Sequence, residues 1–314
     1  MLRFTLRRLV SAVPVLALVS LFAFGVIWLV PGDPASVLLG PGATSTQLAH
    51  MRQELGLNQP IWLQMLGWYG RILHGDLGQS ILLRRGVTGA IIERLPVTLS
   101  LAGLAFVVAV LLGIAAGLLA AMKHRTASDQ AIVVLALLGL SIPEFWLGLM
   151  LIFGFAVDLR WFPAGGYVPL TQNVAGWLRA LALPAFTLAV VQVGFIARMT
   201  RAAMLDVLHQ DFIRTADAKG LPRGLVLVRH GLPNALVPIL TVIGIIVGGL
   251  LGGAVVVEQV FSLPGVGRLI IDAILSRDFP VIQGGLLFLA LIYLVVNLIV
   301  DMLYALVDPR VRLA

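Results

Sequence analysis

Six long apolar runs constrain this chain more than any other feature of its sequence. The first, residues 9–30, contains no charged residue, and about 20 apolar residues suffice for a helix to cross the hydrocarbon core of a bilayer. Five more runs follow, at residues 97–122, 131–157, 181–199, 237–257 and 281–300. Charged residues make up 12% of the chain, compared with about 25% in soluble domains. We therefore predict an all-α polytopic membrane protein with six transmembrane helices.

The basic residues predict which loops face the cytoplasm. Six spans place both termini on one side, and 13 of the 22 lysines and arginines lie in the N-terminus, residues 123–130, residues 198–233 and the C-terminal tail. Because cytoplasmic loops carry an excess of Lys and Arg, both termini are predicted to be cytoplasmic. A cleaved signal peptide is the alternative for the first run, but that run is too long for a signal core and no A-x-A site follows it.

This topology divides the chain into four parts. Residues 1–30 are predicted to form a cytoplasmic N-terminus and the first span, and residues 31–96 an extracytoplasmic segment. Residues 97–307 contain the other five spans and a cytoplasmic loop at 202–236. Residues 308–314 form a cytoplasmic tail.

The extracytoplasmic segment is predicted to contain short amphipathic helices. Thr44 and Gln47 fit a capping box that opens the first helix, and Gly56 fits its end. Residues 60–74 place apolar side chains on one side of a second helix. The segment is either a cap resting on the spans or, in addition, a docking surface for a substrate-delivery protein.

Several classes of function lack support in the sequence. The formal charge of +7 could indicate nucleic-acid binding, but the membrane topology explains it better, so no nucleic-acid partner is predicted. There is no cysteine, and the five histidines form no HExxH motif, so no metal site is predicted. Neither lysine, Lys123 or Lys219, lies in a phosphate-binding GxxxxGK[ST] motif. We predict that the chain holds no cofactor, is not an enzyme, and depends on another subunit for any ATP it uses.

Glu144 stands out as a charge inside a predicted span. It follows Pro143 and would lie about 20 Å along a straight helix counted from Ala131, near the middle of the membrane. An ionisable group at that depth faces a cavity or a partner. One hypothesis is that Glu144 lines a translocation path and favours a cationic group on the substrate. The alternative is a carboxyl that is protonated, or paired with an arginine or hydroxyl of a neighbouring helix.

The predicted span at residues 237–257 is rich in glycine. Gly244, Gly248 and Gly252 are spaced by four residues, as are Gly249 and Gly253. Such faces let helix backbones approach closely. They serve either packing inside one subunit or an interface with a second membrane subunit.

A polar stretch at residues 202–238 separates two apolar runs. Leu205, Leu208, Phe212 and Ala216 fall at helical spacing and predict one apolar face. Gly220 followed by Pro222 predicts a helix end and a new helix start. Two short amphipathic helices between spans favour docking of a soluble partner.

This stretch resembles the cytoplasmic "EAA" loop of permease subunits of ATP-binding-cassette importers. Residues Asp211 to Gly220 read DFIRTADAKG, the form typical of the dipeptide, oligopeptide, glutathione and nickel branch, and Leu232-Pro233 follow at the family's distance. Further motifs of that branch are Pro31-Gly32-Asp33-Pro34, Leu55-Gly56-Leu57, Gly75-Asp76-Leu77-Gly78-Gln79-Ser80, Ser141-Ile142-Pro143, Pro264-Gly265-Val266-Gly267, Arg277-Asp278-Phe279-Pro280 and Asp308-Pro309-Arg310. Glu144 departs from the uncharged residue expected in this branch.

The resemblance implies a type I importer permease of the bacterial inner membrane. It would form half of a translocation pore for di- or oligopeptides, beside a second homologous permease in the lipid bilayer. Two cytoplasmic ATPase subunits would bind ATP and Mg, and an extracytoplasmic binding protein would deliver the substrate. The ATPase-coupling residues would be Asp211, Arg214, Thr215, Ala216, Lys219 and Gly220. A nickel-chelate or glutathione importer is one alternative, and a secondary transporter without ATPase subunits is another.

Overall fold

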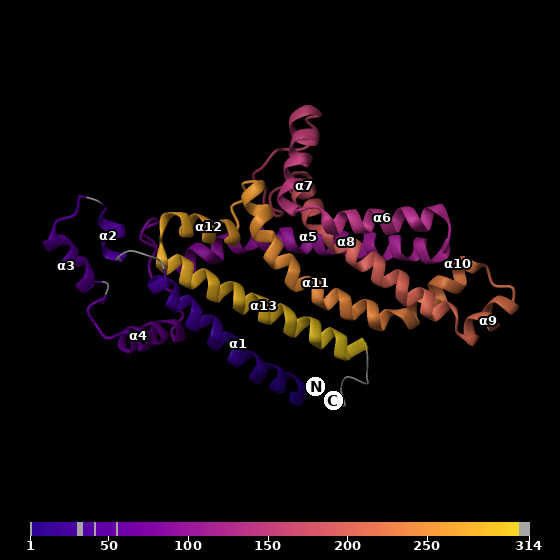
Figure 1. The fold of residues 1–314 in the computed structure, drawn as a ribbon, viewed down its shortest axis with the longest axis horizontal. Coiled ribbons are helices and arrows are strands. Elements are labelled where there is room, and N and C mark those ends of the chain that lie inside the picture. Colours follow the sequence, from indigo (N-terminus) through magenta and orange to yellow (C-terminus); the bar gives the residue numbers. More distant parts are fainter. Residues whose placement is uncertain (1, 30–33, 41, 55, 308–314) are drawn as a thin grey trace. The chain divides into compact units, whose positions relative to one another are not determined.

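The computed structural model describes residues 2–29, 34–40, 42–54 and 56–307. Regular structure in these ranges is helical apart from an isolated antiparallel bridge between Gln79 and Gly86. The helices, labelled in Figure 1, are α1 (Leu2–Leu29), α2 (Pro34–Leu39), α3 (Ser45–Glu54), α4 (Ile61–Leu73), α5 (Val87–Met122), α6 (Ala127–Ser141), α7 (Glu144–Leu151), the π-helix η1 (Ile152–Asp158), α8 (Val174–Leu208), α9 (Asp211–Ala218), α10 (Arg223–Leu225), the π-helix η2 (Val226–Gly231), α11 (Leu232–Val260), α12 (Val266–Ser276) and α13 (Phe279–Val307). The predicted tail at 308–314 and the motif residues 31–33 lie outside the described ranges.

Five helices in the described ranges are long and apolar enough to cross a membrane, and a bent helix pair makes a sixth candidate. This confirms the all-α polytopic fold. Two helices extend well beyond the predicted spans. The helix predicted to start at Val97 begins at Val87 and passes through Pro96, and the span predicted at 181–199 lies within α8. Apolar composition marks the part that must be shielded from water, whereas backbone hydrogen bonds continue a helix into polar sequence.

The prediction of one straight span over residues 131–157 was wrong. Helix α6 ends at Ser141, and α7 begins at Glu144 with a bend of 104° between the two pieces. Ile142 is extended, as the residue before a proline prefers, and Pro143 has no N–H to continue the α6 ladder. The depth of about 20 Å inferred for Glu144 along a straight helix therefore does not apply.

The described chain forms two compact units. The first unit contains, of the described residues, 97–264 and 295–307. Helix α8 is its centre, since 67% of its most apolar stretch is buried inside the protein, compared with 33% for the stretch in η2 and α11. Helices α6, α7 and α11 pack on α8, and Figure 1 shows α7 turning away from α6 at the break. Gly194 lets α8 approach the backbone of α6, where a side chain would collide with the carbonyl oxygen of Ala136 at 2.6 Å.

The second unit contains residues 2–96 and 265–294. Helix α4 packs on α1 and α13 through buried Trp68, whose ring centroid lies 5.6 Å from that of Phe24. The predicted capping box is confirmed, because the Thr44 N–H donates to Gln47 Oε1 at 2.9 Å and the Gln47 N–H donates to Thr44 Oγ1 at 3.4 Å. Of the two predicted amphipathic helices, α4 therefore rests on apolar partners in its own unit.

Two motif segments that lie far apart in the sequence meet in the second unit. Asp278 is buried, and its Oδ2 accepts hydrogen bonds from Ser80 Oγ at 2.5 Å and from the Leu82 N–H at 3.1 Å. Ser80 Oγ in turn accepts from the Leu83 N–H at 2.9 Å. The carboxylate thereby fixes the turn at residues 80–83 that leads into α5.

Candidate functional site

The predicted coupling segment, residues 202–236, belongs to the first unit and consists of four helical pieces. It contains the end of α8, the short helix α9, the α10–η2 pair and the start of α11. The prediction of one apolar face through Leu205, Leu208, Phe212 and Ala216 was wrong, because the helix breaks at His209 and Gln210. The predicted end and restart are confirmed, since α9 stops at Ala218 and α10 begins directly after Pro222.

Helix α9 has one face buried against its own unit. Ile213 and Ala216 are 3% and 7% exposed and join an apolar cluster with Met204, Val207, Val226 and Leu227. Ala216 therefore contacts this chain itself, and any effect it has on a partner would act through the position of α9. The cluster fixes α9 to α8 and η2.

The other face of α9 is exposed. Phe212 has 39% of its surface exposed, and Asp211, Arg214, Thr215 and Lys219 are also exposed. Arg214 Nη1 lies 3.5 Å from Asp211 Oδ1, a loose exposed pair that contributes little to stability. Of the six predicted coupling residues, the structure thus places Ala216 inward and the other five outward or at the helix end. Phe212, which was not one of the six, is the large apolar side chain on this exposed face.

Gly220 follows α9 with a φ of +75°. No atom lies within 4 Å of the position that a Cβ would take, so the backbone conformation and not crowding requires glycine. This conformation disfavours a side chain at the position, since the left-handed region is costly for residues other than glycine.

A buried ion pair that the sequence reasoning missed anchors the start of the coupling segment. Asp129 is 3% exposed and receives hydrogen bonds from Arg201 Nε at 2.6 Å and from Arg201 Nη2 at 2.8 Å. The Arg125 N–H donates to the same carboxylate at 3.0 Å, and His124 Nδ1 lies 3.4 Å away. This two-pronged pair joins the start of α6 to α8 directly before residue 202. In the sequence, the only signal for this ion pair was the opposite charge of Asp129 and Arg201. A chain contains many such oppositely charged pairs of residues.

Glu144 begins α7 and lies against α11. A Cβ added to Gly253 would stand 2.7 Å from Glu144 Oε2 and 2.9 Å from Oε1, and 2.7 Å from Leu188 Cδ1 on α8. No arginine or hydroxyl group pairs with the Glu144 carboxylate within the described ranges. The structure thus gives no partner for a paired Glu144, and the protonated carboxyl is the form of the alternative that stays open.

The glycine face of α11 serves packing inside the unit at two positions. Gly253 faces Glu144 and Leu188, and a side chain at Gly244 would collide with Val300 of α13 at 2.9 Å. Gly252 is exposed, and its Cβ position meets no atom within 4 Å. The interface with a second membrane subunit stays a prediction, with Gly252 as its open position.

Glu258 is a second carboxylate inside a candidate span, and the sequence analysis missed it because the predicted span ended at Val257. It is fully buried, and its Oε1 accepts a hydrogen bond from Thr98 Oγ1 at 2.6 Å. The bond joins α5 to α11. The available sequence signal was a charged residue, Glu258, directly after the end of a predicted span. The sequence does not show which residue donates a hydrogen bond to it.

Replacing Thr98 by valine should destabilise the protein by about 2 kcal/mol, because a hydrogen bond to a buried charged group is lost while the side-chain shape is kept. Thermal unfolding of the purified protein in detergent measures the loss. Thr241→Val is the matched control, since the Thr241 hydroxyl is exposed and donates to Val237 O of its own helix. Equal melting temperatures for the two variants would contradict the role of Thr98.

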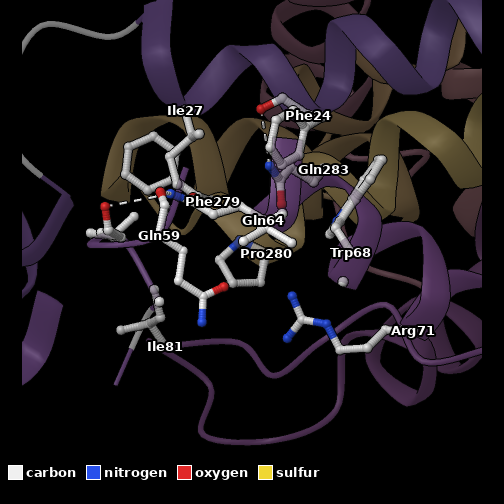
Figure 2. Close-up of a pocket in the computed structure, with 14 residues that line it drawn as sticks. Phe24, Ile27, Gln59, Gln64, Trp68, Arg71, Ile81, Phe279, Pro280 and Gln283 are labelled. Carbon is white, nitrogen blue, oxygen red and sulfur yellow. Dashed lines mark hydrogen bonds between the residues drawn. The ribbon is translucent and has the colours of Figure 1, made fainter. Parts of the chain in front are cut away.

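A cavity of about 460 Å³ lies in the second unit, between α1, α4 and the start of α13 (Figure 2). Trp68, Phe24 and Arg71 border it, and Gln283 donates to Phe24 O at 3.3 Å. Two of the motif segments, around Gly56 and around Pro280, also line this cavity. The cavity combines aromatic walls with one cationic side chain.

Comparison with known families matches nearly the whole chain. Residues 113–313 match the family model described as binding-protein-dependent transport system inner membrane component, and residues 1–102 match the N-terminal model of such membrane components. A chain of the MetNI methionine ABC transporter, solved in inward-facing conformations, has the same fold, with a TM-score of 0.59 at 19% identity. That alignment covers 69% of this chain and 96% of the other.

Curated relatives align from end to end. A protein of Brucella abortus (strain 2308), predicted to be a peptide transport system permease, is 48% identical over 98% of both chains. The di/tripeptide transport system permease protein DppB of Pseudomonas aeruginosa is 41% identical over 99% of both. The oligopeptide transport system permease protein AppB of Bacillus subtilis is 40% identical over 99% of this chain and all of that one. This chain therefore belongs to the family of binding-protein-dependent transport system inner membrane components, multi-pass proteins of the bacterial inner membrane.

Proposed function

We propose that this protein is the permease subunit of an ATP-driven peptide importer and forms half of the path for di- or oligopeptides. The observation that carries the proposal is its 48% identity, over 98% of both chains, to a predicted peptide transport permease. The named relatives at 40–41% identity act on dipeptides, tripeptides and oligopeptides. A second homologous permease would form the other half of the path.

The exposed face of α9 is the proposed contact with the ATPase subunits. It presents Phe212 between charged and polar side chains, and its opposite face is fixed by Ile213 and Ala216. A helix held rigidly to α8 can transmit the movement of a bound partner into the spans. This arrangement supports Asp211, Arg214, Thr215, Lys219 and Gly220 as contact residues, with Ala216 acting by positioning α9. ATP and Mg would be held by the ATPase subunits.

The topology and the delivery step belong to the same proposal. Both termini and the coupling segment would lie in the cytoplasm, as the Lys and Arg distribution favours. The segment at residues 31–96 would face the binding protein that delivers the peptide. Its support is the cavity bordered by Trp68 and Arg71, which offers an aromatic and a cationic contact beside the outer end of α1.

Reconstitution of the complete importer tests this function. The permease should co-purify with an ATPase, and vesicles containing the complex and its binding protein should take up a labelled tripeptide when ATP is supplied. Uptake that follows an ion gradient without ATP would overturn the proposal in favour of a secondary transporter. Uptake of glutathione or a nickel chelate, with no uptake of peptides, would overturn the choice of substrate.

A further inference from the structure

In the first unit, α7 and α8 each place one polar side chain over a glycine face of α11, at consecutive turns of that helix. Gly249 and Gly253 are one turn apart on α11, so they share a face and lie about 6 Å apart along the helix axis. The Glu144 carboxylate from α7 lies over Gly253, within 2.7 Å of the Cβ position. The Gln192 amide from α8 lies over Gly249, with Nε2 3.4 Å from the Cβ position. Any side chain at Gly253 would occupy the space of the carboxylate.

Gln192 is the independent sign that this face receives a ligand. The residue is only 9% exposed, and the described residues give its amide no hydrogen-bond partner. Its amide nitrogen and oxygen are not among the fully enclosed unpaired polar atoms, so water or a ligand can reach the amide and pair with it. The amide is directed toward Gly249, where the absence of a side chain leaves its edge accessible.

The Glu144 carboxylate sets the charge of that ligand. It forms no ion pair among the described residues, and an ionisable group inside a span faces a path or a partner. A carboxylate selects an ammonium group, and an amide that can donate and accept selects a peptide bond. An extended peptide advances about 3.5 Å per residue, so a terminal ammonium at Gly253 would place the next peptide groups beside Gly249.

A bare divalent cation fits this face poorly. No group of three or more His, Cys, Asp or Glu side chains that could hold a metal ion occurs within the described part of the chain. One carboxylate and one amide leave most coordination positions of such an ion unfilled, and nickel favours imidazole or thiolate ligands. The chemistry of the face therefore favours an organic ammonium.

We infer that Glu144, Gln192 and the Gly249–Gly253 face form a subsite of the translocation path that binds the free N-terminus of a peptide. Glu144 contacts the terminal ammonium, and Gln192 contacts the backbone amide that follows. Gly249 leaves room beside that amide for the peptide main chain, whereas Gly253 leaves room for the carboxylate itself. The subsite adds selection for a free amino terminus inside the membrane. This inference rests on the proposed peptide transport.

The test compares a free tripeptide with its N-acetylated form in vesicles containing the complete importer. Trialanine and N-acetyl-trialanine are each supplied on saturating, preloaded binding protein, so that the maximal uptake rate reports the membrane steps. The measured quantity is the ratio of the uptake rates of the free and the acetylated peptide. We expect a ratio of about ten for the wild type, as a net difference of one charge contact allows. Glu144→Gln should reduce this ratio to about one. Glu144→Asp, which keeps the charge, should retain most of the preference.

Two further variants guard against a purely structural effect. Gln192→Ala should slow both peptides equally, because both carry the peptide bonds that join the alanines. Gly253→Ala should lower the ratio as Glu144→Gln does, because its methyl group displaces the carboxylate. Asp158→Asn is the control, since this exposed carboxylate at the end of η1 lies outside the face, and it should leave the ratio unchanged.

The possible results separate this inference from the proposed function. If the wild type takes up neither peptide, peptide transport itself is wrong and the subsite falls with it. If the wild type takes up peptides but Glu144→Gln and Gly253→Ala keep the wild-type ratio, the subsite alone is wrong. If the Glu144 variants fail to assemble, Gly253→Ala alone is the test: a lowered uptake ratio supports the subsite, and a wild-type ratio overturns it.

Discussion

Replacing Phe212 by aspartate should abolish ATP-driven uptake while leaving the permease folded. Phe212 has 39% of its surface exposed on the outer face of α9, and burying a phenylalanine against a partner contributes about 1.5–3 kcal/mol. Losing that contact and burying a charge instead should weaken binding of the ATPase by tenfold or more. Titration of the ATPase subunit onto the permease in nanodiscs measures the affinity, and peptide uptake measures the coupling.

The neighbouring residue provides the matched comparison. Ile213 is 3% exposed on the opposite face of α9, so Ile213→Ala should lower the melting temperature of the permease as well as its coupling. Phe212→Asp should lower the coupling alone. Full ATPase binding and full uptake by Phe212→Asp would show that this face of α9 is not the docking surface. Substitution of Ala216 cannot separate the two effects, because its side chain lies in the buried cluster.

The second large effect is expected at the Asp129–Arg201 pair. Asp129→Ala removes a carboxylate that accepts two bonds from one guanidinium, and removing one member of a buried pair typically costs 3–5 kcal/mol. Because the Arg201 side chain is partly exposed, we expect a loss of about 3 kcal/mol in the free energy of unfolding. Uptake should also fall, since the pair holds α8 directly before the coupling segment. Thermal unfolding in detergent and uptake in vesicles are the measurements.

A double-mutant cycle isolates the pair from other effects of the substitutions. The double variant, with both Asp129 and Arg201 replaced by alanine, should lose less stability than the two single losses added together. Glu93→Ala is the control, because Glu93 pairs with Arg85 at 2.6 Å but both side chains are exposed, and such pairs contribute little. A melting temperature for Asp129→Ala equal to that of the control would contradict the anchoring role.

Much of the architecture follows from local sequence. Apolar length predicts the spans, because crossing a bilayer needs a fixed length of helix. The Thr44–Gln47 capping box and the left-handed Gly220 were also predictable, since each depends on a few neighbouring residues. The motif at residues 211–220 indicated the family, and the match over residues 113–313 confirms it.

The candidate sites depended on tertiary structure. Thr98 and Glu258 are 160 residues apart, and Asp129 and Arg201 are 72 apart, so no local periodicity connects them. The inward face of α9 is set by contacts with α8 and η2, which the spacing of Phe212 and Ala216 could not reveal. The break before Glu144 brought its carboxylate to Gly253 of α11, whereas a straight helix would have carried it elsewhere. The helices and the family could be predicted from the sequence, because they depend on composition and short-range spacing. Which charged side chains meet could be seen only in the folded structure, because that depends on how helices distant in sequence pack together.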